Sequence, residues 1–109
     1  MTTLQAIERW YTSQCDGDWE HMYGVDIGTV DNPGWAVAID LHETELDGVP
    51  FEAVKRGDSE EGDDWLMLRV EGRQFRGSGD PSKLDVILRA FLDWAQPHAA
   101  AEPAAAGRP

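Results

Sequence analysis

Apolar side chains recur with a helical period near both ends of the chain. The first amphipathic helix is predicted over residues 3–14, with Thr3 as N-cap and a buried stripe of Leu4, Ile7, Trp10 and Tyr11. The second is predicted over residues 80–95, where Asp80 precedes Pro81 at the first helical position. Its expected buried face consists of Leu84, Ile87, Leu88, Phe91, Leu92 and Ala95.

Between these helices, apolar and polar positions alternate with a period of two, which is typical of strands. The expected strands are residues 23–28, 35–41, 51–55, 65–71 and 74–76. The Asp31-Asn32-Pro33-Gly34 sequence predicts a turn between the first two, with Gly34 at a positive φ. Ala36 and Ala38 place small side chains on the second face of their strand, which indicates that a helix packs there as well.

These elements predict an α+β fold with an N-terminal helix, an antiparallel meander sheet of four to five strands, and a C-terminal helix packed on the same sheet face. Residues 2–96 are expected to form a single domain. Residues 97–109 are rich in Ala and Pro and hold no large apolar side chain. They are therefore predicted to form a disordered tail.

Charge narrows the choice of partner. The 109 residues include 9 Lys and Arg against 21 Asp and Glu, for a formal net charge of −12. This argues against a nucleic-acid or anionic membrane partner and favours a partner protein with a basic surface. No run of about 18 apolar residues and no basic N-terminal start occurs, so the expected location is the cytoplasm.

The segment from Cys15 to His21 is the densest group of polar side chains. It suggests either a Cys–His nucleophilic pair or a metal site, but its spacing matches no zinc template and no oxyanion hole is apparent. Because a lone cysteine is often buried and Asp often caps a helix, we expect no catalytic residue, metal or cofactor here. A small hydrolase or metal-binding enzyme that depends on Cys15 and His21 remains the alternative.

Two acidic segments are candidates for partner binding. Trp19 lies between Asp18 and Glu20, so it is either a core residue or an exposed anchor beside carboxylates. The loop at 58–64 is either a solvated loop or an electrostatic steering surface. The candidate contact residues are Asp16, Asp18, Trp19, Glu20, His21, Asp58, Glu60, Glu61, Asp63 and Asp64.

Several motifs together resemble the immunity protein 53 family of bacterial polymorphic toxin systems. They are Trp10-Tyr11, the segment 15–21 with Gly24, the segment 29–35, Asp40-Leu41, Thr44-Glu45-Leu46, Asp64-Trp65 and Gly79-Asp80-Pro81. The resemblance covers about residues 4–95. It implies a small cytoplasmic inhibitor that binds a cognate toxin, and it supplies no established catalytic or contact residues.

The leading hypothesis is therefore a non-enzymatic immunity protein that blocks its toxin stoichiometrically. The acidic loop would steer the encounter, and Trp19 with its neighbouring carboxylates would make close contact. A nuclease, whose substrate groove is basic, would suit this acidic chain. The sequence excludes neither a homodimer nor a chaperone-like or regulatory interaction module.

Overall fold

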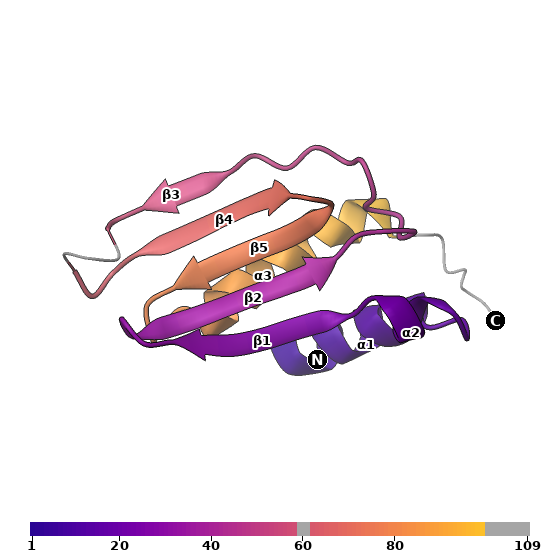
Figure 1. Ribbon diagram of the computed structural model, residues 1–109, viewed down its shortest axis with the longest axis horizontal. Coiled ribbons are helices and arrows are strands. Elements are labelled where there is room, and N and C mark those ends of the chain that lie inside the picture. The colour runs from indigo at the N-terminus through magenta and orange to yellow at the C-terminus, as the bar shows by residue number, and fades with distance from the viewer. Residues whose placement is uncertain (59–61, 100–109) are drawn as a thin grey trace.

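The computed structural model describes residues 1–58 and 62–99 and arranges them as one sheet with helices (Figure 1). The elements are α1 (Thr3–Gln14), α2 (Trp19–Met22), β1 (Val25–Val30), β2 (Gly34–Asp40), β3 (Val54–Arg56), β4 (Leu66–Glu71), β5 (Gln74–Gly79), α3 (Leu84–Ala95) and a 3-10 helix, η1 (Gln96–His98). The α+β class with an N-terminal helix, a five-stranded antiparallel sheet and a C-terminal helix is confirmed.

The strand order is β1-β2-β5-β4-β3, so the predicted meander is wrong in one respect. β5 pairs with β2, and the segment after β2 crosses to the far edge of the sheet, where β3 lies. Ile39 of β2 and Phe75 of β5 are opposite each other, and each is 0% exposed. The three residues of β3 are all exposed. Apolar strands therefore take the centre and the short polar strand takes an edge.

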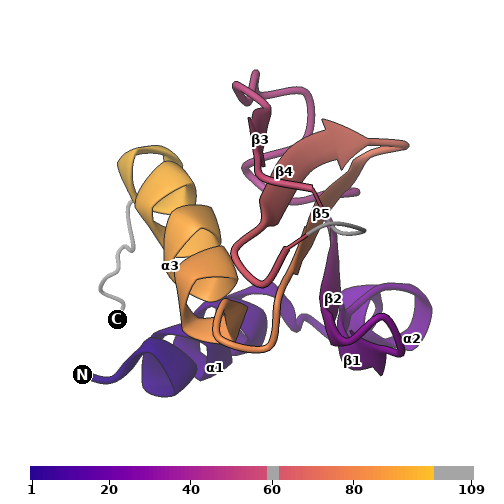
Figure 2. The ribbon, with the colours of Figure 1, turned by 90° about the vertical axis from the view of Figure 1, so that its left-hand side faces the viewer.

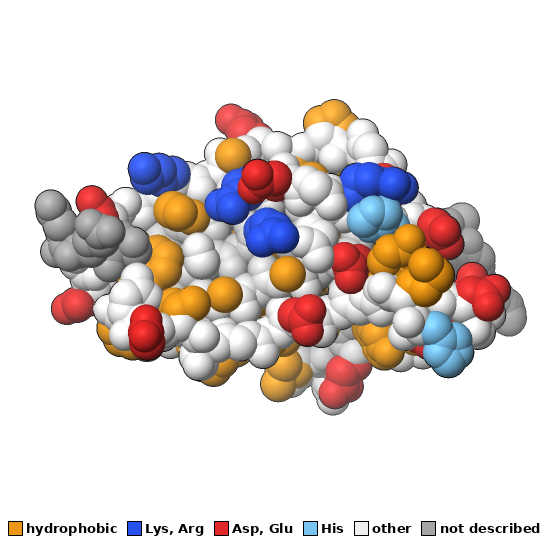
Figure 3. Space-filling view, viewed as in Figure 1, with side chains coloured by type: hydrophobic (Ala, Val, Ile, Leu, Met, Phe, Trp, Pro, Cys, Tyr) orange, Lys and Arg blue, Asp and Glu red, His pale blue; other side chains and the backbone are white. Residues whose placement is uncertain are grey.

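Helices α1 and α3 lie on the same face of the sheet (Figure 2) and contact each other. Phe75 packs edge-on against Phe91 of α3, with ring centroids 5.2 Å apart. Within the described residues, no helix covers the middle of the opposite face, which Figure 3 shows in space-filling form. The expectation of a helix over Ala36 and Ala38 is therefore wrong, because both long amphipathic helices bury their apolar stripes on the other side.

Helix α1 buries a narrower stripe than its sequence predicts. Ile7 and Trp10 are buried, whereas Leu4 is 60% and Tyr11 is 37% exposed. The N-cap is Thr2 rather than Thr3, and it forms a capping box with Gln5. The helix lies beside β1 at the margin of the sheet (Figure 1), where only one strip of its surface meets other elements.

Helix α3 begins at Leu84 instead of directly after Asp80, because the backbone and carboxylate of Asp80 are bound by Trp65, the residue just before β4. Its predicted buried face is confirmed, with Ile87, Leu88, Phe91 and Ala95 buried and Leu84 and Leu92 partly so. β5 continues past the predicted end at Arg76 to Gly79. A Cβ at Gly77 would lie 2.5 Å from Ile87 Cγ2, so this glycine lets α3 approach the sheet.

The β1–β2 turn contains a cis Asn32–Pro33 bond. Gly34 belongs to β2 and is not at a positive φ, contrary to the prediction. A Cβ there would clash with the Gly79 carbonyl oxygen, so position 34 requires glycine because β2 and β5 pack closely.

The C-terminal part of the described chain continues beyond α3 into η1, so residues 96–98 form a short 3-10 turn. Residues 100–109 of the predicted disordered tail lie outside the described residues, and the 2–96 domain boundary stays a prediction. Among residues 1–58 and 62–99, no helix is long and apolar enough to cross a bilayer.

Candidate functional site

The carboxylates of Asp16 and Glu20 bind backbone groups of the turn between α1 and α2. Asp16 Oδ1 accepts hydrogen bonds from the N–H groups of Asp18 at 3.0 Å and Trp19 at 2.9 Å. Glu20 accepts from the N–H groups of Asp16 at 3.0 Å and Gly17 at 2.9 Å. The bonds from Trp19 and then Asp18 lower the pKa of Asp16, because they stabilise its charged form. Both carboxylates thus shape the segment predicted to contact a partner.

Trp19 lies in the core, with 2% of its surface exposed. Its indole N–H donates to the His42 carbonyl oxygen at 2.8 Å, and its ring packs edge-on against Trp10 at 6.1 Å. The interpretation of Trp19 as an exposed anchor is therefore wrong, and the core interpretation holds. Its neighbours Asp18 and His21 are exposed.

The Cys15–His21 pair of the alternative hypothesis is not assembled in this structure. Cys15 is half-buried, and its Sγ donates to the Tyr11 carbonyl oxygen at 3.3 Å. No hydrogen bond joins Cys15 to His21 in the described part of the chain. Within the same residues, no group of three or more His, Cys, Asp or Glu side chains is placed to hold a metal ion.

A polar contact missed by sequence reasoning ties the segment after β2 to α1. The Glu45 carboxylate accepts from the Trp10 indole N–H at 3.1 Å and from the Gln14 amide at 3.0 Å. His42, next to it in the same segment, stacks on Tyr23 with ring centroids 4.8 Å apart. Glu45 is more than 30 positions away from both Trp10 and Gln14 in the chain, so no local sequence pattern could have revealed this contact.

The second acidic segment lies near the opposite end of the sheet. Glu60 and Glu61 fall outside the described residues, and Asp58 and Asp63 are exposed. Asp64 is also largely exposed, but its Oδ1 accepts a hydrogen bond from Lys83 Nζ at 2.6 Å. One of the predicted steering carboxylates is thus anchored to the start of α3.

Lys83 also pairs with Asp80, a buried carboxylate that is 1% exposed. Asp80 accepts from Lys83 Nζ at 2.6 Å, from the Ser82 hydroxyl at 2.6 Å and from the Trp65 N–H at 3.0 Å. The Lys83 ammonium, followed by the Ser82 hydroxyl, holds the pKa of Asp80 well below its ordinary value. The carboxylates of Asp64 and Asp80 raise the pKa of Lys83 in turn.

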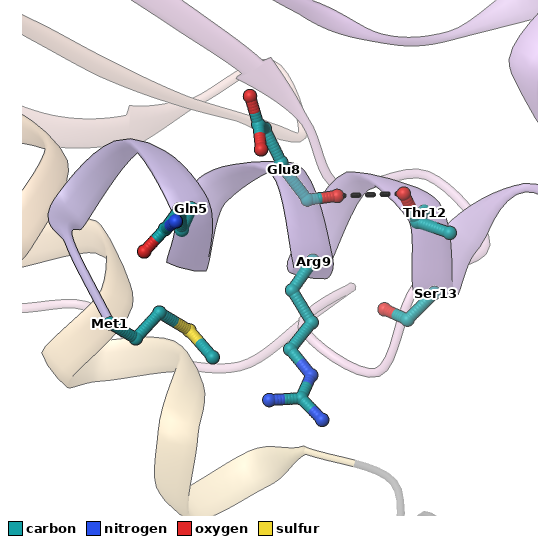
Figure 4. Close-up of a pocket in the computed structure, with 6 residues that line it drawn as sticks. All are labelled: Met1, Gln5, Glu8, Arg9, Thr12 and Ser13. Carbon is teal, nitrogen blue, oxygen red and sulfur yellow. Dashed lines mark hydrogen bonds between the residues drawn. The ribbon is translucent and has the colours of Figure 1, made fainter.

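An open groove runs along the outer surface of α1 (Figure 4). It is lined by Met1, Gln5, Glu8, Arg9, Thr12 and Ser13. The side chains of Glu8 and Arg9 point to opposite sides of the helix, and the Thr12 hydroxyl donates to the Glu8 carbonyl oxygen at 2.8 Å. The polar groups of this groove therefore do not converge on a common point, as the groups of a catalytic site would.

These features define a small acidic α+β domain, built of one antiparallel sheet with two helices on one face. The chain belongs to the immunity protein 53 family, because residues 4–96 match the family described as Immunity protein 53. This confirms the resemblance expected from the motifs. No curated protein and no solved structure matches the chain.

The motifs that carry the family resemblance lie at the two ends of the sheet. Trp10, the turn at 16–19 and Glu45 meet at one end through the contacts described above. At the other end, Asp80 binds Trp65, and the Trp35 indole donates to the Pro81 carbonyl oxygen at 3.0 Å. Many of these residues thus fasten loops to the sheet, so the motifs by themselves do not mark the surface that meets a partner.

Proposed function

We propose that this protein binds a cognate bacterial toxin and neutralises it as a stoichiometric complex, in the cytoplasm of the cell that makes both. The match of residues 4–96 to an immunity protein family is the observation that carries this proposal. The proposal takes the protein to be a binder rather than an enzyme. The absence of an assembled Cys15–His21 pair is consistent with that choice.

The charge of the molecule supports a toxin with a basic surface. A net charge of −12 raises the encounter rate with a cationic protein and opposes binding to nucleic acid or an anionic membrane. Asp18 and His21 present their side chains to solvent at one end of the sheet, where they would contact the toxin. A second acidic segment would steer the encounter, and it contains Asp58, Glu60, Glu61, Asp63 and Asp64. Asp16, Glu20 and Trp19 would hold the first contact segment in shape.

Co-expression with the product of the adjacent gene tests the proposal. The toxin alone is expected to arrest growth, the pair is expected to grow, and the two chains are expected to co-purify in a fixed ratio. Absence of both rescue and complex would overturn the proposal.

Two substitutions in the same rescue assay distinguish stoichiometric binding from the enzymatic alternative. Cys15→Ala and His21→Ala are expected to retain protection, because stoichiometric binding uses no nucleophile or base and the loss of one contact at His21 weakens the complex without abolishing it. If both variants fold normally yet fail to protect, catalytic neutralisation replaces stoichiometric binding as the favoured function.

A further inference from the structure

The face of the sheet that no helix covers carries a larger share of basic side chains than this acidic chain does as a whole. In an antiparallel pair, residues directly opposite point to the same face, and neighbours along a strand alternate. Ile39, Phe75 and Val70 form one such row on the helix side. The next row, Asp26-Ala38-Arg76-Arg69, therefore points away from the helices, as does Gly28-Ala36-Ser78-Met67-Lys55.

Three of the nine Lys and Arg residues of this acidic chain point outward on that face. They are Lys55 of β3, Arg69 of β4 and Arg76 of β5, and all three are exposed. Figure 3 shows basic side chains over these strands, with an acidic side chain directly beside them and other acidic side chains farther out. The acidic residues on the same face are Asp26, Asp40 and Glu71, of which Asp40 is bound by the Gly24 N–H and the Gln74 amide.

Arg69 and Arg76 are directly opposite each other on neighbouring strands. Like charges in this position destabilise a sheet, and each guanidinium has five N–H donors to satisfy. The structure gives Arg69 one bond, to Glu71 at 2.7 Å, and Arg76 one bond, to the Gln74 side-chain oxygen at 2.7 Å. No ion pair is found for Arg76 or Lys55 in residues 1–58 and 62–99. Glu71 thus compensates the charge of Arg69 in part, while Arg76 bonds only a neutral amide oxygen. A local cost that is only partly compensated within the chain is typical of a functional surface.

Small side chains lie next to the arginine pair. Ala38 is directly opposite Arg76 on β2, and Ala36 and Ser78 occupy the adjoining row. All three are partly exposed, so they form a shallow floor on which another chain can lie close to the backbone of the sheet.

We propose that the cognate toxin docks on this open sheet face and places an Asp or Glu carboxylate between Arg69 and Arg76. The inference rests on the proposed function and adds the surface and the chemistry of the contact. Two guanidinium groups side by side offer paired N–H donors, which match the two oxygens of a carboxylate. An anionic group from the toxin also relieves the repulsion that remains between the arginines after Glu71 has paired with Arg69. The toxin surface thus complements a cationic centre that is surrounded by acidic side chains. The acidic side chains would set the rate of encounter, and the two arginines would fix the position of the toxin on the sheet.

Charge reversal at Arg76 tests the inference on the purified complex. Arg76→Glu is expected to weaken toxin binding by about tenfold or more, measured as Kd by calorimetry. The reversal places opposite charges in the cross-strand pair, so the sheet is expected to stay folded, which thermal unfolding of the free protein checks. Arg89→Glu, on the exposed side of α3, makes the same change in net charge away from this face and is expected to leave Kd within about twofold of the wild type.

The outcomes separate the two proposals. If Arg76→Glu binds like the wild type, or if Arg89→Glu weakens binding equally, the docking surface is overturned while the immunity function stands. If the wild-type chain neither binds nor rescues, the immunity function fails and the docking inference fails with it. Binding of a labelled duplex oligonucleotide by the wild type, lost in Arg76→Glu, would show that the face recognises phosphate and would overturn the inference. Recovery of Arg76→Glu binding by an Asp→Arg or Glu→Arg change in the toxin would identify the carboxylate.

Discussion

At the scale of single residues, the indole groups show how a large side chain can be buried and still satisfy its polar atom. Trp10, Trp19, Trp35 and Trp94 each donate an indole hydrogen bond to an acceptor more than 20 positions away in the chain. Each such contact ties a helix or strand to a distant loop. The rings of Trp10 and Trp19 are buried and those of Trp35 and Trp94 partly so, while each N–H reaches an acceptor at the edge of the core.

Trp19→Ala is expected to lower the free energy of unfolding by about 3–5 kcal/mol, because it leaves a cavity beside Trp10 and removes the bond to the His42 carbonyl. Urea denaturation followed by far-UV circular dichroism measures the loss. His21→Ala, on the exposed side of the same short helix, serves as the control and is expected to change stability by less than about 0.5 kcal/mol. Equal effects of the two substitutions would show that Trp19 is not a core residue.

At the scale of elements, the contact between α3 and β5 depends on the absence of a side chain. Gly77→Ala would bring a Cβ to 2.5 Å from Ile87 Cγ2 and 3.1 Å from Leu68 Cδ2. We expect a loss of about 1–3 kcal/mol in the free energy of unfolding, since α3 must shift away from the sheet. Gly28→Ala, where a Cβ would meet no atom within 4 Å, is the matched control and is expected to be neutral or slightly stabilising. Denaturation of both variants by urea decides the point.

The junction between β4, β5 and α3 is fastened by charge, so its stability depends on pH. The pKa of Asp80 is lowered in the folded protein, first by Lys83 and then by Ser82. Its contribution is therefore complete above its unfolded pKa of about 3.9 and is lost as the pH falls toward the folded value. Lys83 has a raised pKa, so its contribution is complete below an unfolded pKa of about 10.4 and is lost only in strong alkali.

Asp80→Asn is accordingly expected to be much less stable than the wild type at pH 7 and to approach it below about pH 3. Urea titrations at pH 7, 5 and 3 measure the difference. Asp63→Asn removes an exposed carboxylate from the nearby acidic loop and is expected to match the wild type at pH 7. A gap between Asp80→Asn and the wild type that stays constant down to pH 3 would argue against the ionised form of Asp80 as the source of stability.

At the scale of the whole molecule, the net charge of −12 is expected to govern how fast the protein meets its partner. The association rate with the toxin should fall steeply, by roughly tenfold or more, as salt rises from about 20 mM to about 500 mM, whereas the dissociation rate should change little. Stopped-flow or surface-based kinetics across this series checks the prediction. An association rate independent of salt would remove electrostatic steering from the proposed function.

The Asp16–His21 segment shows the limit of reading a site from sequence. The sequence left two interpretations of Trp19 open, as a core residue or as an exposed anchor. Whether Trp19 faced solvent or the core could not be decided locally, because the answer depends on Trp10, Tyr23 and His42, which the fold brings around its ring. The same holds for Asp80, whose position before Pro81 suggested a helix cap, whereas its partners include Trp65, the residue just before β4.

The periodicity of apolar side chains by itself determined the two long helices, the strands and the α+β class, because each element must bury one face wherever it packs. The motif pattern likewise determined the family. Strand order, the side of the sheet that both helices cover, and the meeting of Arg69 with Arg76 were decided only by the tertiary structure. These features depend on which distant segments of the chain pair with one another. The pairing is decided by how all the apolar faces together fill one core, and no local stretch of sequence contains that information.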